Sequence, residues 1–174
     1  MSGSLLPGSV VALGPPLNRK SVRCHTMRID HVALWTTDLD QCKQFYVSYF
    51  GAVAGTGYVN PAKGFKSCFL SFADGAHIEA MKTTTLSPVV VEPGAQRIGL
   101  THIAISLGSE RLVDELTQRL KTDGFPILDG PRRTGDGYYE SVTLDPDGNR
   151  IEITACVDTR TSLRNGGPPG SGGV

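Results

Sequence analysis

The chain of 174 residues carries 17 basic and 17 acidic side chains, and 39% of its residues are hydrophobic. This length suits one domain or two small fused modules, and the balanced charge argues against a nucleic-acid or anionic-membrane partner. No segment approaches the roughly 20 continuous apolar residues that a membrane span needs. The four cysteines are far apart and form no C-x-x-C pair, which favours free thiols in a reducing compartment over disulfides or a zinc ribbon. We therefore expect a cytoplasmic protein.

Both ends of the chain are predicted to be disordered extensions. Residues 1–26 contain three basic residues and no acidic one, and their basic residues follow the apolar stretch, which is the reverse of a secretory signal. An organelle transit peptide is the alternative interpretation of this acid-poor leader. Residues 159–174 are rich in Gly and Pro and cannot bury a core. The folded domain is therefore expected over residues 27–158.

The first half of this domain predicts one strand, one helix and three further strands. Residues 29–35 alternate like a strand, and the next segment is a helix with Thr37 as its predicted N-cap and Gly51 as its stop. Helical spacing gives this helix an apolar face of Leu39, Cys42, Phe45, Tyr46, Tyr49 and Phe50. The three strand-like runs cover residues 52–59, 66–73 and 76–82.

The second half predicts the same order of elements. A loop over residues 83–99 separates module one (28–83) from module two (99–156). The strand 100–107 leads to a helix that starts near Ser109, whose apolar face is Leu112, Val113, Leu116 and Leu120 and whose stop is Gly124. The last three strands are expected at residues 125–130, 137–145 and 149–155. The sequence thus predicts an α+β fold of two βαβββ modules.

Particular residues repeat between the modules as well. DHVAL in module one matches THIAI in module two, which aligns His31 with His102 at an offset of 102 − 31 = 71. ADGAHIEA matches PDGNRIEI, which aligns Glu79 with Glu152 at an offset of 152 − 79 = 73. A single strand His or Glu is usually a structural or solvated residue. Equivalent strands of two packed modules, however, would place these four side chains symmetrically.

Two imidazoles and two carboxylates form a set with a chemical use. They suit a divalent Zn, Ni, Fe, Mn or Co ion and leave one or two coordination positions open for water or substrate. Ala33 and Ala104 each follow their His by two positions on the same strand face, so they leave room above the sheet. We therefore predict a metal-assisted site for a small molecule.

The motifs H-V-A-L, H-I-E-A, T-H-I-A-I and D-P-D-G-N-R-I-E over residues 28–156 resemble the vicinal oxygen chelate superfamily. That superfamily includes glyoxalase I, extradiol dioxygenases and bleomycin resistance proteins. The resemblance implies paired βαβββ modules whose curled mixed sheets surround a metal ion. It also places His31, Glu79, His102 and Glu152 on the four metal-ligand positions of glyoxalase I. Glu152 would then be the catalytic base, with Glu79 as its symmetric partner.

The resemblance implies a metal-dependent lyase or isomerase that acts on a small α-hydroxy carbonyl or thiohemiacetal through an enediolate. This chain departs from bacterial glyoxalase I at Trp35, where that family has an Arg that contacts glutathione, and at Thr83, where it has an Asn. The usual glutathione contacts are thus missing, and Trp35 is expected to form an apolar pocket wall. The other candidate pocket residues are Arg132, Arg133 and one of the alternating pair Tyr138 and Tyr139, with Tyr138 the one we select.

Two other functions fit parts of the pattern. An Fe(II) extradiol-type dioxygenase needs only two His and one carboxylate, so Glu79 would be surplus. A non-catalytic drug-binding protein of the resistance type lacks the ligand set altogether. A homodimer is expected because an open sheet edge tends to be covered by a partner. The sequence is compatible with sites that form within one chain and with sites that form across two chains.

Overall fold

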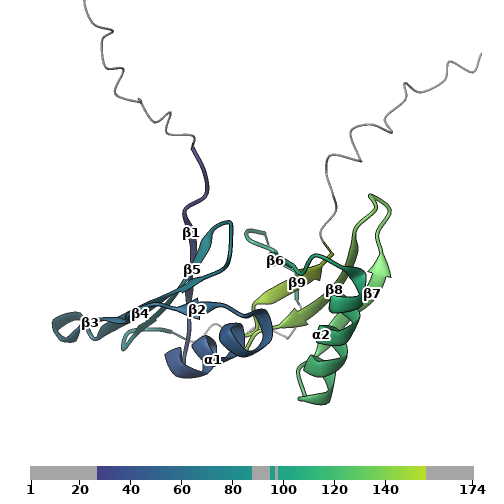
Figure 1. Cartoon of the computed structure of the whole chain (residues 1–174). Coiled ribbons are helices and arrows are strands. Elements are labelled where there is room, and N and C mark those ends of the chain that lie inside the picture. Colours follow the sequence, from purple (N-terminus) through teal and green to yellow (C-terminus); the bar gives the residue numbers. More distant parts are fainter. Residues whose placement is uncertain (1–26, 88–94, 97, 156–174) are drawn as a thin grey trace, which may run out of the picture.

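The computed structural model describes residues 27–87, 95–96 and 98–155 of the chain. The predicted extensions at 1–26 and 159–174, and part of the predicted loop over 83–99, lie outside the described residues. Figure 1 shows the described residues as two sheets that stand side by side, each with one helix against it. Both sheets contain parallel and antiparallel pairs, so the predicted α+β class is confirmed.

Module one forms the first sheet. Its elements are β1 (His31–Trp35), α1 (Leu39–Phe50), β2 (Val53–Ala54), β3 (Tyr58–Asn60), a 3-10 turn (Pro61–Lys63), β4 (Phe65–Ser71) and β5 (His77–Thr83). The strand order is β1-β5-β4-β2, with β3 also paired to β4, and β1 and β5 run parallel. The single strand predicted at 52–59 is wrong, because it is split into β2 and β3 around Gly55 and Gly57. Glycine has no side chain to pack on a sheet and interrupts strands readily.

Module two forms the second sheet with the same order of elements, except that its second strand is not split. These are β6 (Ile103–Ser106), α2 (Glu110–Thr122), β7 (Ile127–Arg133), β8 (Tyr139–Leu144) and β9 (Arg150–Thr154). The strand order is β6-β9-β8-β7, and β6 and β9 run parallel. The predicted βαβββ repeat is therefore confirmed. Figure 1 also makes clear that β9 is an interior strand between β6 and β8.

The helix ends agree with the sequence in part. Gly51 ends α1 in the left-handed conformation with φ 65°, and Ser109 caps α2, as predicted. The prediction that Thr37 caps α1 is wrong, because the Asp38 carboxylate accepts the hydrogen bonds of the first free backbone N–H groups. A carboxylate at this place also faces the positive end of the helix dipole. Thr37 instead donates from its backbone N and its hydroxyl to Asp147 of module two.

The buried faces of the two helices share one hydrophobic core. The core combines residues of both modules, including Phe45 and Tyr46 of α1, Leu120 of α2 and Ile153 of β9. On α2 the predicted apolar residue Leu112 is 38% exposed, so its assignment to the buried face is wrong. Thr117, further along the helix and buried, has its hydroxyl satisfied by hydrogen bonds to Ser141 and to a backbone carbonyl of its own helix. Neither α1 nor α2 has the length and apolar character needed to cross a bilayer.

A buried hydrogen bond joins the two modules at the D-P-D-G-N turn. The Tyr46 hydroxyl donates to the Asp145 carboxylate at 3.0 Å, and both residues are buried. Asp145 also accepts hydrogen bonds from the backbone N–H groups of Asp147 and Asn149, which shapes the turn between β8 and β9. Burial raises the pKa of Asp145 above its usual range. The D-P-D-G-N part of the last motif is therefore a structural turn that fixes module two to helix α1.

Candidate metal half-sites

The predicted ligands lie on the face of each sheet that is turned away from its helix, here called the open face. Side chains alternate between the two faces of a strand. On β1, Leu34 points into the core, and its neighbours Ala33 and Trp35 are exposed on the other side. The same alternation on β6 and β9 sends Ile151 and Ile153 into the core and Glu152 to the open face.

In module one, His31 and Glu79 face each other across the parallel pair β1 and β5. The His31 Nε2 atom lies 3.8 Å from a Glu79 carboxylate oxygen. Ala33 is the register partner of Glu79, so the small side chain predicted to leave room stands beside the carboxylate. The other ring nitrogen, Nδ1, lies 3.1 Å from the Asp30 carboxylate. This hydrogen bond lowers the pKa of Asp30.

Module two repeats the arrangement, with a different residue as the hydrogen-bond partner of the histidine Nδ1 atom. The His102 Nε2 atom lies 3.5 Å from a Glu152 carboxylate oxygen, and Ala104 is the register partner of Glu152. The His102 Nδ1 atom lies 3.2 Å from the Thr101 hydroxyl. Each module therefore holds one imidazole by its Nδ1 atom and turns its Nε2 atom toward a carboxylate.

This geometry fits the donor set of a divalent metal ion. When Nδ1 carries the ring proton, Nε2 keeps its electron pair for a metal. The Asp30 carboxylate favours this tautomer of His31 because it accepts a hydrogen bond, and the Thr101 hydroxyl, which can accept or donate, orients the His102 ring. The glutamate side chains are 18% and 17% exposed in modules one and two, so both are held and still accessible. Sequence reasoning missed Asp30 and Thr101, although each stands directly before its His.

The two His–Glu pairs do not meet within one chain. Across the described residues, no group of three or more His, Cys, Asp or Glu side chains has a geometry that could hold a metal ion. Each module thus holds one imidazole and one carboxylate, which are half of the predicted four-ligand set. We call them the half-site of module one (His31 and Glu79) and the half-site of module two (His102 and Glu152).

The predicted pocket residues divide between the two faces. Trp35 is 48% exposed on the open face, on the same strand as His31. Tyr139 bonds through its hydroxyl to Asp114 of α2 and packs against the core, so it lies on the helix side. Tyr138, its neighbour, is 39% exposed. Neighbouring strand residues point to opposite faces. Since Tyr139 lies on the helix side, Tyr138 is the tyrosine of this pair that can face a ligand.

The two arginines separate in the same way. Arg133 pairs with Glu110 of α2 and lies over the Tyr139 ring at 5.8 Å, on the helix side. Arg132 pairs with Asp129 and lies 3.5 Å from the Glu140 carboxylate. A bulge between Asp129 and Arg132 brings both to the open face, since their partners on β8 lie two residues apart. Arg132 is the arginine that shares a face with Glu152.

Glu140 is a charged residue of this face that sequence reasoning missed. It lies on β8, one strand from Glu152, and its side chain is only 13% exposed. Burial, and then the nearby Glu152 carboxylate, raise the pKa of Glu140, while Arg132 opposes this shift. The alternation of the strand indicates its face, but only the pairing of β8 with β9 brings it near the half-site.

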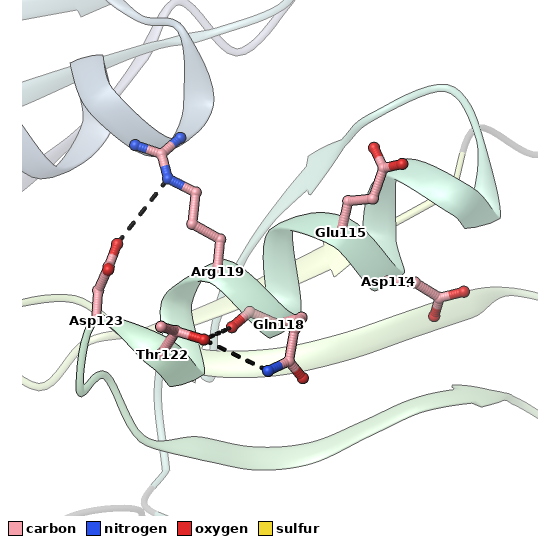
Figure 2. Close-up of a pocket in the computed structure, with 6 residues that line it drawn as sticks. All are labelled: Asp114, Glu115, Gln118, Arg119, Thr122 and Asp123. Atoms are coloured by element: carbon pink, nitrogen blue, oxygen red, sulfur yellow. Dashed lines mark hydrogen bonds and ion pairs between the residues drawn. The ribbon is translucent and has the colours of Figure 1, made fainter.

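A separate feature is a shallow surface depression along α2. Figure 2 shows its lining side chains on one side of the helix, with the ion pair between Arg119 and Asp123 at one end. The lining residues are Asp114, Glu115, Gln118, Arg119, Thr122 and Asp123. The depression contains none of the residues of either half-site.

The fold is shared with solved structures of glyoxalase I. Glyoxalase I from Zea mays matches with a TM-score of 0.61 and 23% identity, over 75% of this chain and 45% of the maize chain. This chain therefore spans less than half the length of the maize enzyme. The trypanothione-dependent glyoxalase I of Leishmania major matches with a TM-score of 0.60 and 21% identity, over 80% of this chain and 91% of that one. At these identities the likeness shows the fold alone.

Two further comparisons concern the sequence. An uncharacterized protein of Bacillus subtilis (strain 168), YqjT, is 25% identical over 134 residues, which are 72% of this chain and 96% of that protein. The sequence profile of the Glyoxalase/Bleomycin resistance protein/Dioxygenase superfamily matches residues 28–153, which include both half-sites. The chain therefore belongs to the Glyoxalase/Bleomycin resistance protein/Dioxygenase superfamily.

Proposed function

We propose that the protein is a metal-dependent lyase or isomerase of the glyoxalase I type, acting on a small α-hydroxy carbonyl or thiohemiacetal compound. The observation that carries this proposal is the duplicated half-site, in which a held imidazole turns Nε2 toward a carboxylate on the next strand. Such a pair arising twice at equivalent places has no evident structural purpose, because both open faces lie outside the hydrophobic core. Solved relatives that share the fold include glyoxalase I.

His31, Glu79, His102 and Glu152 would together hold one divalent ion. Imidazole nitrogen and carboxylate oxygen suit Zn, Ni, Fe, Mn or Co, and two carboxylates balance the charge of the ion. A divalent ion held by these residues would supply Lewis-acid chemistry, which would make a C–H bond next to a substrate carbonyl more acidic.

The proton transfer itself belongs to the glutamates. Glu152 would take the proton from one substrate carbon and return it to the next, with Glu79 as the matching group of the other half-site. Their partial burial restricts both carboxylates and still leaves them accessible from the open face. The facing alanines, Ala33 and Ala104, leave space for a substrate directly beside each carboxylate.

Two copies of the chain are proposed to complete the site. In this arrangement the half-site of module one on one chain faces the half-site of module two on the other. This accounts for the absence of a complete ligand cluster among the described residues of one chain. A symmetric dimer forms two such sites, because the same pair of surfaces meets twice.

The test is elemental analysis of the purified protein together with an assay on the methylglyoxal–glutathione hemithioacetal. We expect stoichiometric divalent metal, with turnover of this substrate or of a related α-hydroxy carbonyl compound that is lost in Glu152→Gln. Protein that binds no divalent metal at any loading would overturn the proposal. Oxygen uptake with a catechol that needs His31 but survives Glu79→Gln would identify a dioxygenase instead.

A further inference from the structure

The two open faces share one framework, so their side chains can be compared position by position. In each sheet the metal-ligand glutamate lies in a row across the strands, Ala33–Glu79–Phe69 in module one and Ala104–Glu152–Val142 in module two. The next row lies two residues away, later in the sequence on the first and last strands of each module and earlier on β4 and β8. In module one it is Trp35, Met81, Ser67 and Tyr58, and in module two it is Ser106, Thr154, Glu140 and Arg132.

These second rows differ sharply in chemistry. The row of module two is polar throughout and ends in the ion pair of Glu140 with Arg132. The row of module one, here called the aromatic row, is apolar except for the buried Ser67 and the Tyr58 hydroxyl. Equivalent positions of a duplicated fold thus carry opposite kinds of side chain. The βαβββ framework that the modules share does not by itself require this difference.

Ring contacts give the aromatic row a defined shape. Phe65, one row further along β4, meets Trp35 edge-on at 6.2 Å between ring centroids and an interplanar angle of 88°. Tyr58 lies 6.1 Å from the same Phe65 ring at 56°. Trp35 and Tyr58 are nevertheless 48% and 56% exposed. The rings are therefore positioned by one another while much of their surface stays open, which is the arrangement that accepts a further ring.

We infer that the aromatic row binds an aryl group of the substrate, so that the substrate class is an α-hydroxy carbonyl compound whose chelating oxygens carry an aromatic substituent. This inference rests on the proposed function. Trp35 follows Ala33 by two residues and Met81 follows Glu79 by two, which places the row about 7 Å from the half-site of module one. That distance suits a ring bonded directly to the chelating group. A glutathione peptide, by contrast, would meet an apolar wall there.

The experiment uses two chelating probes that differ only in this substituent. Benzohydroxamate and acetohydroxamate bind divalent metals through the same two oxygens, but one carries a phenyl ring and the other a methyl group. We expect the metal-loaded protein to bind benzohydroxamate about tenfold more tightly or better, by calorimetry. Trp35 is the only tryptophan of the chain, so its emission should shift to shorter wavelength with benzohydroxamate and not with acetohydroxamate.

Two variants make the test specific. Trp35→Ser gives module one the residue that module two has at the equivalent position, and should abolish the preference while metal content is unchanged. Ser106→Ala, the matched change in module two, should preserve the preference. Equal affinity for both probes, or a preference that survives Trp35→Ser, would overturn the inference and leave the metal site standing.

The emission of Trp35 separates two further outcomes. If this emission is already shielded and insensitive to either probe, the aromatic row is an interface between copies of the chain, and the inference is overturned. Failure to bind metal overturns the proposed function, and this inference with it.

Discussion

The Nε2 atom of His102 lies 3.5 Å from the Glu152 carboxylate because β6 and β9, far apart in sequence, run parallel as neighbours. The same relation, at 3.8 Å, joins the histidine and glutamate of module one. Each pair combines the first and last strands of its module, so a half-site forms only when the whole βαβββ unit has folded. Folding and ligand assembly are thereby coupled in each module.

The first prediction concerns the proposed base. Glu152→Gln keeps an oxygen donor and removes the proton acceptor, so carbon-to-solvent proton exchange should fall by about 10²–10⁴-fold. Exchange is followed as deuterium incorporation into the active substrate, at saturating metal and with bound metal measured in the same sample. Glu79→Gln is the matched variant in module one. Unchanged exchange in Glu152→Gln at full metal occupancy would remove Glu152 from this role.

The second prediction concerns Asp30, the hydrogen-bond partner of the proposed ligand His31. Asp30 holds the Nδ1 atom of His31, and loss of such a partner typically weakens metal binding by about 10–100-fold. We therefore expect Asp30→Ala to weaken metal binding by this factor in a competition titration with a chelator. Asp40→Ala is the control, since Asp40 is an exposed acid on α1 paired with Lys43. Equal metal affinity in both variants would show that the Asp30 contact has no such effect.

The third prediction concerns the joint between the modules. Tyr46→Phe leaves the buried Asp145 carboxylate without its hydroxyl donor, which should lower the free energy of unfolding by about 1.5–3 kcal/mol. Tyr49→Phe is a matched control on the same helix, because its hydroxyl also donates across the modules, to Asp123, but in an exposed place. Tyr49→Phe should lower the free energy of unfolding by about 0.5 kcal/mol or less. Urea unfolding measures both, and equal losses would contradict a special role for the buried bond.

The fourth prediction concerns pH and Cys42. Burial, and then the charge of Asp145, raise the pKa of the Cys42 thiol to about 12. Only about one molecule in ten thousand would then carry the thiolate at pH 8, so iodoacetamide should not modify Cys42 in the folded protein. The raised pKa also stabilises the folded state below the pKa of the unfolded thiol, and this contribution is lost as pH rises toward 12. Peptide mapping after alkylation, with urea-unfolded protein as control, checks the first point; rapid labelling of folded protein would contradict it.

The repeat is the most informative feature of the sequence, and it predicts the fold. Strands show hydrophobic residues at every second position and helices show them at every third or fourth, and both patterns can be matched between the two halves of the chain. This match aligns His31 and Glu79 with His102 and Glu152. Small side chains beside the carboxylates, such as Ala33, are also predictable. The contacts between residues that are far apart in the sequence cannot be predicted in this way. Thr37 matches the residue preference of a helix cap, and no neighbouring residue indicates that it instead bonds Asp147 of the other module.

Faces and partners near β7 could not be predicted for a physical reason. Alternation assigns a face only while the strand stays regular, and the bulge of β7 breaks the count between Asp129 and Arg132. At Gly130, within this bulge, φ is +75° and a Cβ atom would collide with the Glu140 carbonyl oxygen. Such close approach depends on tertiary pairing, so the sequence predicts neither the bulge nor the place of Glu140.

The central claim, that two chains share each metal site, is tested by mixing two inactive variants. One carries His31→Ala and Glu79→Ala, the other His102→Ala and Glu152→Ala, so each chain keeps a single half-site. Neither variant alone should bind metal tightly. After the variants are unfolded and refolded together, about half of the dimers should be mixed, and each mixed dimer should regain one of its two sites. The mixture should therefore bind about one quarter of the wild-type metal content. If each site forms within one chain, the mixture will bind no more metal than the separate variants, and the claim of a shared site is contradicted.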